Sequence, residues 1–81
     1  MPTIHKERGY RFFFYSNENL EPPHIHVIGH GGEAKIWLTP IEFSKVYNLK
    51  KKSQREILEI VNFNAKLFKR KYEEWHGVSS N

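Results

Sequence analysis

Two histidines in the stretch Glu21–Val27, "EPPHIHV", are the residues of this sequence best suited to chemistry. His24 and His26 stand two positions apart, so on a strand both imidazoles project to the same side. At neutral pH one imidazole can accept a proton while another donates one, which suits general acid–base catalysis on a phosphodiester. The same pair offers two nitrogen ligands, with Glu21 or Glu33 as a third, so a divalent-metal site is the lesser alternative.

Strand alternation predicts which side chains accompany the two histidines. Ile25 and Val27 alternate with them and are expected to face the core, which leaves both imidazoles on an open face. The flanking strands add a carboxylate, two cations and three aromatic rings to this face: Glu33, Lys35, Arg11, Phe13, Tyr15 and Trp37. Lys35 or Arg11 would then stabilise negative charge in a transition state. The rings would stack the unpaired bases of RNA.

Positive charge is concentrated in the second half of the chain. Residues 41–81 carry nine Lys and Arg side chains against five Glu, and much of the excess lies in Lys50, Lys51, Lys52 and Arg55. Such asymmetry indicates an anionic partner, and a solvated helix face is the alternative interpretation.

Length and composition restrict the class of protein. With 81 residues the chain predicts a single domain, and the absence of cysteine excludes disulfide scaffolds, thiolate zinc sites and cysteine nucleophiles. No apolar run approaches the ~20 residues of a membrane span. We therefore expect a cytoplasmic protein without a membrane segment, and we predict no cofactor.

Hydrophobic periodicity predicts an α+β domain over residues 1–81. An antiparallel meander of four to five strands is followed by one long amphipathic helix packed on one face. The strands are expected at about 3–7, 10–16, 24–28 and 33–38, with a fifth, ambiguous strand at 41–49. Ser53–Glu56 matches a capping box, and apolar residues at spacings of three and four extend the helix over about 54–75. Because one helix covers one face only, the other face is free for a ligand or a subunit.

Several segments of the chain also carry a resemblance. "MPTI" at the start, "RFFFYSNE" at 11–18, "EPPHIHV" at 21–27 and "EAKIWL" at 33–38 together resemble a family of very short bacterial proteins. That family is classed only as a domain of unknown function. Its members are typically encoded beside a small domain similar to an antitoxin or DNA-binding regulator. The resemblance implies a toxin–antitoxin pair and a cognate antitoxin-like partner, and it assigns no catalytic residues.

Two functions from different classes follow. The first is a toxin-like protein that acts on or binds RNA through the open face, with His24, His26 and Lys35 as the catalytic group of a metal-independent ribonuclease. The second is a non-enzymatic interaction module that uses the same face for a homodimer or a partner complex.

Overall fold

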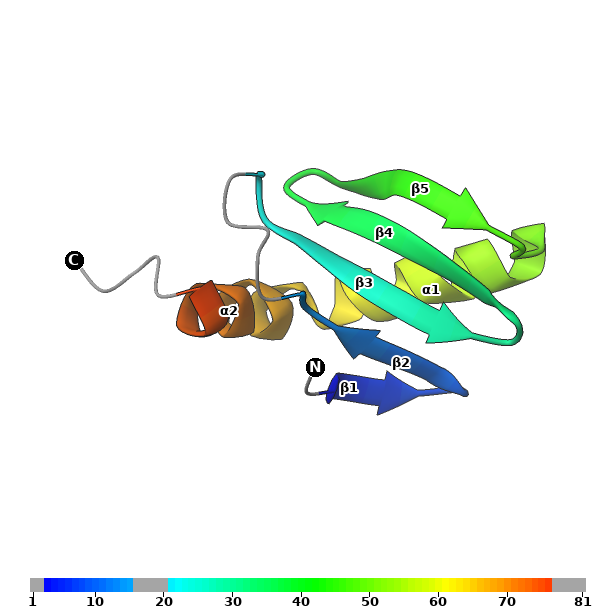
Figure 1. The fold of residues 1–81 in the computed structure, drawn as a ribbon, viewed down its shortest axis with the longest axis horizontal. Helices are drawn as coiled ribbons and strands as arrows, with labels where there is room; N and C mark the ends of the chain where they lie inside the picture. Colours follow the sequence, from blue (N-terminus) through cyan, green and yellow to red (C-terminus); the bar gives the residue numbers. More distant parts are fainter. Residues whose placement is uncertain (1–2, 16–20, 77–81) are drawn as a thin grey trace.

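The fold is a five-stranded antiparallel sheet followed by two helices, which confirms the α+β class (Figure 1). The computed structural model describes residues 3–15 and 21–76. The strands are β1 (Thr3–Glu7), β2 (Tyr10–Phe13), β3 (His24–Gly29), β4 (Gly32–Leu38) and β5 (Ile41–Tyr47), and they neighbour one another in chain order. The ambiguous segment 41–49 therefore forms a strand over 41–47. The predicted strand 10–16 ends early, because Phe14 and Tyr15 leave the ladder and residue 16 lies outside the described residues.

Two tight turns place the β1–β2 and β3–β4 connections at the same end of the sheet. Arg8 and Gly9 have φ angles of 55° and 82°, and His30 and Gly31 have φ angles of 52° and 82°. Positive φ at both central residues is the geometry of a type I′ turn, whose twist matches that of paired strands. The start of the first helix, which follows β5, lies at this end too (Figure 1).

Both edge strands of the sheet contain an irregularity. In β1 the pairing changes between Thr3 and His5, and in β5 it changes at Ser44, which has no opposite partner in β4. An extra residue of this kind bends an edge strand and makes it a poorer template for a further strand. In β5 it also changes which side chains face outward: Lys45 and Tyr47 share a face with their β4 partners on the open side of the sheet.

The predicted single helix is wrong, because the helical segment is broken at Asn64. Helix α1 spans Lys51–Phe63 and helix α2 spans Ala65–His76. The Asn64 side chain donates a hydrogen bond from Nδ2 to the Ile60 carbonyl at 2.8 Å, and its φ of −103° departs from helical geometry. The Asn64 backbone N–H donates to the same carbonyl at 3.0 Å, so this residue forms the C-cap of α1. The capping box is also wrong, since Lys50 is the N-cap, without a side-chain cap, and Ser53 lies inside the helix.

Both helices cover the same face of the sheet, and the core lies between the two layers (Figure 1). Its buried members are Tyr10, Phe12, Phe14, Ile25, Val27, Ala34, Ile36, Leu38, Ile57, Ile60, Val61, Phe68 and Tyr72. Ile25 and Val27 thus face the helices as the alternation predicts. Within residues 3–15 and 21–76, no helix is long and apolar enough to cross a bilayer.

Candidate functional site

His24 is on the predicted side of β3, but its imidazole is buried, with 1% of its surface exposed. Three aromatic rings surround it, with centroids at 5.2 Å for His26, 5.6 Å for Trp37 and 6.1 Å for Tyr72. Its Nδ1 lies 2.8 Å from the Pro22 carbonyl oxygen, which can only accept, so Nδ1 carries the hydrogen. The expectation of an exposed imidazole at this position is therefore wrong. Tyr72 of α2 is one of the groups that cover His24, because it reaches the end of the sheet where β3 begins.

His26 is only partly buried and lies among the aromatic residues that were predicted to accompany it. Its ring is stacked on Phe13 at 5.8 Å with an interplanar angle of 23°, and it meets Tyr15 edge-on at 4.4 Å. Phe13 is itself buried, since the guanidinium of Arg11 also lies over its ring at 4.8 Å. Phe13 therefore packs against His26 and Arg11 and does not offer a free ring face on which a base could stack.

Lys35 and Trp37 form one contact group with Glu21 at the beginning of β3. The Lys35 ammonium forms an ion pair with the Glu21 carboxylate and lies 4.7 Å from the centroid of the Trp37 ring. This carboxylate also lies 3.8 Å from Nε2 of His24. The predicted proximity of Lys35 to both histidines is present, because Lys35 is also paired with His26 across the β3–β4 ladder.

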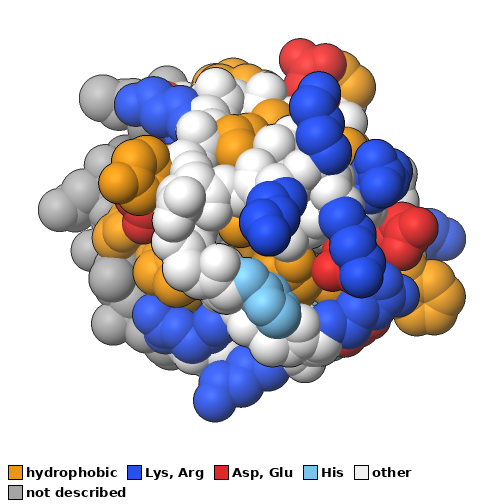
Figure 2. All heavy atoms as spheres, turned by 90° about the vertical axis from the view of Figure 1, so that its right-hand side faces the viewer, with side chains coloured by type: hydrophobic (Ala, Val, Ile, Leu, Met, Phe, Trp, Pro, Cys, Tyr) orange, Lys and Arg blue, Asp and Glu red, His pale blue; other side chains and the backbone are white. Residues whose placement is uncertain are grey.

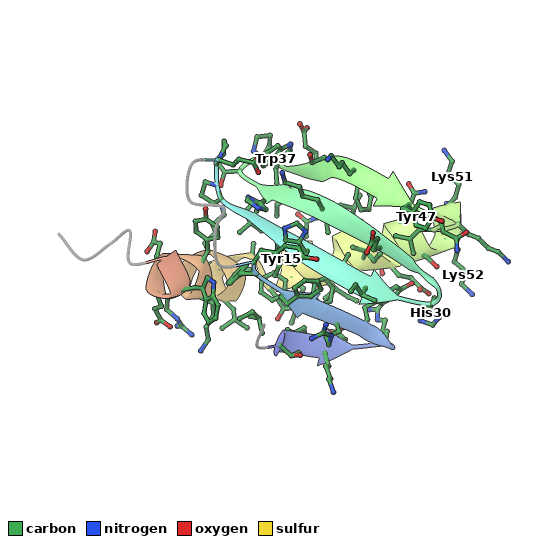
Figure 3. The ribbon with its side chains drawn as sticks, in the orientation of Figure 1. Tyr15, His30, Trp37, Tyr47, Lys51 and Lys52 are labelled. Atoms are coloured by element: carbon green, nitrogen blue, oxygen red, sulfur yellow. The ribbon has the colours of Figure 1, made fainter. Side chains whose placement is uncertain are left out.

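A pocket of about 540 Å³ lies on the open face, which is turned toward the viewer in Figure 3. We call it the open-face pocket. The side chains that carry its chemistry are Tyr15, His26, Ile28, Glu33, Lys35, Lys45 and Tyr47. In the ladder, His26, Lys35 and Lys45 form one row across β3–β5, and Ile28, Glu33 and Tyr47 form the next. The volume lies within the range of about 300–1,000 Å³ that is usual for ligand sites.

Sequence reasoning missed Lys45, Tyr47 and Ile28 as members of this site. Strict alternation along β5 would place Glu42 and Lys45 on opposite faces of the sheet. The extra residue Ser44 shifts the alternation by one position and brings both side chains to the same face. With that change, Glu42 faces as Trp37 does and Lys45 faces as Lys35 does. The odd spacing of Glu42 and Lys45 was the signal in the sequence for this shift.

Glu33 and Lys45 both line the open-face pocket and form no ion pair with each other or with another residue that the structure describes. They belong to adjacent rows of the ladder, because Glu33 is opposite Tyr47 and Lys45 is opposite Lys35. The Glu33 carboxylate, an acceptor, and the Lys45 ammonium, a donor, thus line the same pocket and can both bind a ligand there.

The remaining predicted cations are divided between two places. Arg11 lies on the open face, outside the open-face pocket, where it donates to the Thr3 hydroxyl at 3.0 Å. Lys50, Lys51, Lys52 and Arg55 are exposed around the beginning of α1. Figure 3 shows two of these lysines at the same end of the molecule as His30 and Tyr47. Figure 2, which views this end, shows Lys and Arg side chains gathered over it. The predicted binding residues are therefore divided among the open-face pocket, the rest of the open face and the basic end at the start of α1.

No group of three or more His, Cys, Asp or Glu side chains in the described part of the chain is arranged to hold a metal ion. Glu21 and Glu33, the proposed third ligands, are on different parts of the site. Glu21 contacts His24 and Lys35, whereas Glu33 is opposite Ile28 and Tyr47.

Comparison with known families gives one match, over residues 9–73, to a domain of unknown function, DUF4160. The chain belongs to this family. The matched DUF4160 region begins at the turn before β2 and ends within α2, so it contains the whole open-face pocket. Neither the comparison with curated proteins nor that with solved structures gives a match.

Proposed function

We propose that this protein binds single-stranded RNA through the open face of its sheet. The observation that carries the proposal is the open-face pocket, in which exposed aromatic rings and lysines occur together. Sheet surfaces that bind single-stranded nucleic acid combine aromatic rings, on which bases stack, with cations that contact the phosphates. Tyr47, with 68% of its surface exposed, and Tyr15, with 38%, offer ring surface at the pocket.

The charge distribution supports a polyanionic ligand. The chain carries a formal net charge of +4, and the basic end at the start of α1 adjoins the pocket through Val46 and Tyr47 of β5. Phosphates of a strand whose bases lie on the open face would come within reach of Lys50 and Lys51 at that end. Each phosphate contact adds sequence-independent affinity that falls with salt.

We propose binding without cleavage by a histidine pair. General acid–base catalysis requires both groups within hydrogen-bond reach of the substrate. His24 is buried behind three rings, so His26 is the imidazole that remains accessible from the pocket. The ribonuclease mechanism that uses both imidazoles is therefore not part of the proposal.

Fluorescence anisotropy with a labelled single-stranded RNA of about ten nucleotides tests the proposal. We expect Tyr47→Ala to weaken binding by about fivefold or more, since one stacked base is worth ~1–3 kcal/mol. We expect Lys45→Ala to weaken binding as well, because a cation of the pocket is lost. The matched controls are Phe63→Ala and Lys66→Ala, which remove an exposed ring and an exposed charge from the helices. Equal losses in both pairs, or no RNA binding by the wild type, would contradict the proposal.

A protein-interaction module is the second candidate, and the exposed apolar residues of the pocket favour it. Ile28 and Tyr47 flank Glu33 on the open face, and exposed apolar and aromatic side chains are typical of interface centres. The partner would be an antitoxin-like protein or a second copy of this chain. Co-expression and sedimentation distinguish the candidates, because a complex or dimer that Ile28→Lys abolishes would favour the interaction module.

A toxin-like role stays a prediction of the family resemblance. Its test is growth of a bacterial culture during induced expression of the chain. We expect inhibition that Tyr47→Ala relieves and Phe63→Ala does not. Unimpaired growth with the wild-type chain at the same expression level would contradict the role.

A further inference from the structure

Glu33 and Lys45 face the open-face pocket and form no ion pair with any residue in the described part of the chain, so they restrict the ligand that the pocket can accept. A carboxylate is an acceptor with two oxygens, whereas an ammonium only donates. A ligand that pairs both carboxylate oxygens and the ammonium presents two adjacent donors on one edge and an acceptor beside them. Lys35 is less available for this role, because Glu21 and the Trp37 ring hold its ammonium.

We infer that the open-face pocket selects guanine, an inference that rests on the proposed binding of single-stranded RNA. The Watson–Crick edge of guanine places N1–H beside the N2 amine, so two donors meet the two oxygens of one carboxylate. The adjoining O6, and N7 behind it, are acceptors that suit a lysine. Glu33 and Lys45 thus have complementary places on a single base.

The other bases match this pair less well. Adenine and cytosine each present one amine to a carboxylate and place an acceptor next to it, so the second oxygen is left facing a lone pair. Uracil has one N–H between two carbonyl groups, which would repel both sides of the carboxylate. Only guanine among the four satisfies both carboxylate oxygens with donors and the ammonium with an acceptor.

The surroundings of Glu33 are suited to a flat base. Ile28 and Tyr47 are its neighbours in the same ladder row, and both are exposed on the open face. An apolar side chain on one flank and an aromatic ring on the other supply contact surface for a ring system. They also lower the exposure to water of the carboxylate in the complex, which strengthens its hydrogen bonds.

The test is a series of single-stranded oligouridines in which one central position is G, inosine, A, C or U. We expect the G oligomer to bind most tightly, ahead of inosine, which lacks the N2 amine and leaves one carboxylate oxygen unpaired. A bidentate base contact gives discrimination of about 5-fold to 150-fold. We expect Glu33→Gln to reduce the ratio of G to inosine affinity toward one.

Glu42→Gln is the matched control, because it removes the same charge from the open face beside Trp37 and outside the pocket. The affinity ratio should stay as in the wild type, although either substitution would raise general affinity for a polyanion. Equal binding of all five oligomers, or a preference for C or A, would overturn the guanine inference and leave RNA binding intact. Absence of binding to every oligomer would overturn the proposed function together with it.

Discussion

Replacing the two histidines one at a time separates a structural role from a binding role. His24→Ala removes a buried ring together with its hydrogen bond to the Pro22 carbonyl oxygen. A hydrogen bond contributes about 0.5–1.5 kcal/mol and each aromatic pair about 0.5–1.5 kcal/mol. With three ring neighbours, we expect the free energy of unfolding to fall by about 3 kcal/mol. A chain of this size has a total of only ~4–12 kcal/mol.

We expect His26→Ala to affect RNA binding more than stability. His26 also has three ring neighbours, Phe13, Tyr15 and His24, but it is only partly buried and the loss of stability should be smaller, about 1 kcal/mol. The imidazole lines the open-face pocket, so RNA affinity should decrease by fivefold or more.

Urea denaturation followed by far-UV circular dichroism measures stability, and anisotropy measures RNA binding. His24→Asn is the second variant at that position, because its side-chain amide can still donate to the Pro22 carbonyl and so favours a folded chain. We expect it to bind RNA within about twofold of wild type. If folded His24→Asn lost binding while His26→Ala kept it, the assignment of His24 to the fold and His26 to the site would be refuted.

The remaining predictions concern stability. Phe68→Ala empties a fully buried position between the helices and the sheet and should cost about 3–5 kcal/mol in urea unfolding, and a loss under 1 kcal/mol would contradict the described core. The hydrogen bond from His5 lowers the pKa of Glu7 below 4.5, so the ionised carboxylate stabilises the fold above that pH and this contribution is lost as pH falls through the lowered pKa. Glu7→Gln should therefore lose less stability than wild type between about pH 5 and 3, and parallel losses would contradict the contact. In Gly32→Ala the new Cβ would lie 2.3 Å from the Asn48 carbonyl oxygen, so a thermal melt should show a larger loss of stability than in Gly31→Ala. At Gly31 the positive φ costs only ~1 kcal/mol, and the new Cβ would make an ordinary contact of 3.7 Å with Nδ2 of Asn48.

The strand order and the division of the sheet into two faces could be predicted because they follow from local properties of the sequence. Turn residues at Arg8-Gly9 and His30-Gly31 fix two hairpins, and period-two alternation fixes the direction of each side chain between them. The apolar pair Ile25 and Val27 therefore identified the face toward the helices correctly, and with it the open face.

The errors arose where distant residues or an irregular backbone decide the outcome. The burial of His24 depends on Tyr72, which is far away in the chain and comes near only when α2 packs. The position of Lys45 depends on the extra residue Ser44, which alternation does not reveal. The apolar stripe continues on both sides of Asn64, so periodicity alone gives no indication that the helix ends there.

The most direct test of the binding surface is side-chain NMR during titration with single-stranded RNA. Ring proton shifts report which aromatic residues meet the bases. We predict shifts for Tyr15, Tyr47 and His26, which line the open-face pocket, and no shift for Phe63 at the exposed end of α1. Shifts confined to Phe63 and other helix residues, with the three pocket rings unchanged, would contradict it.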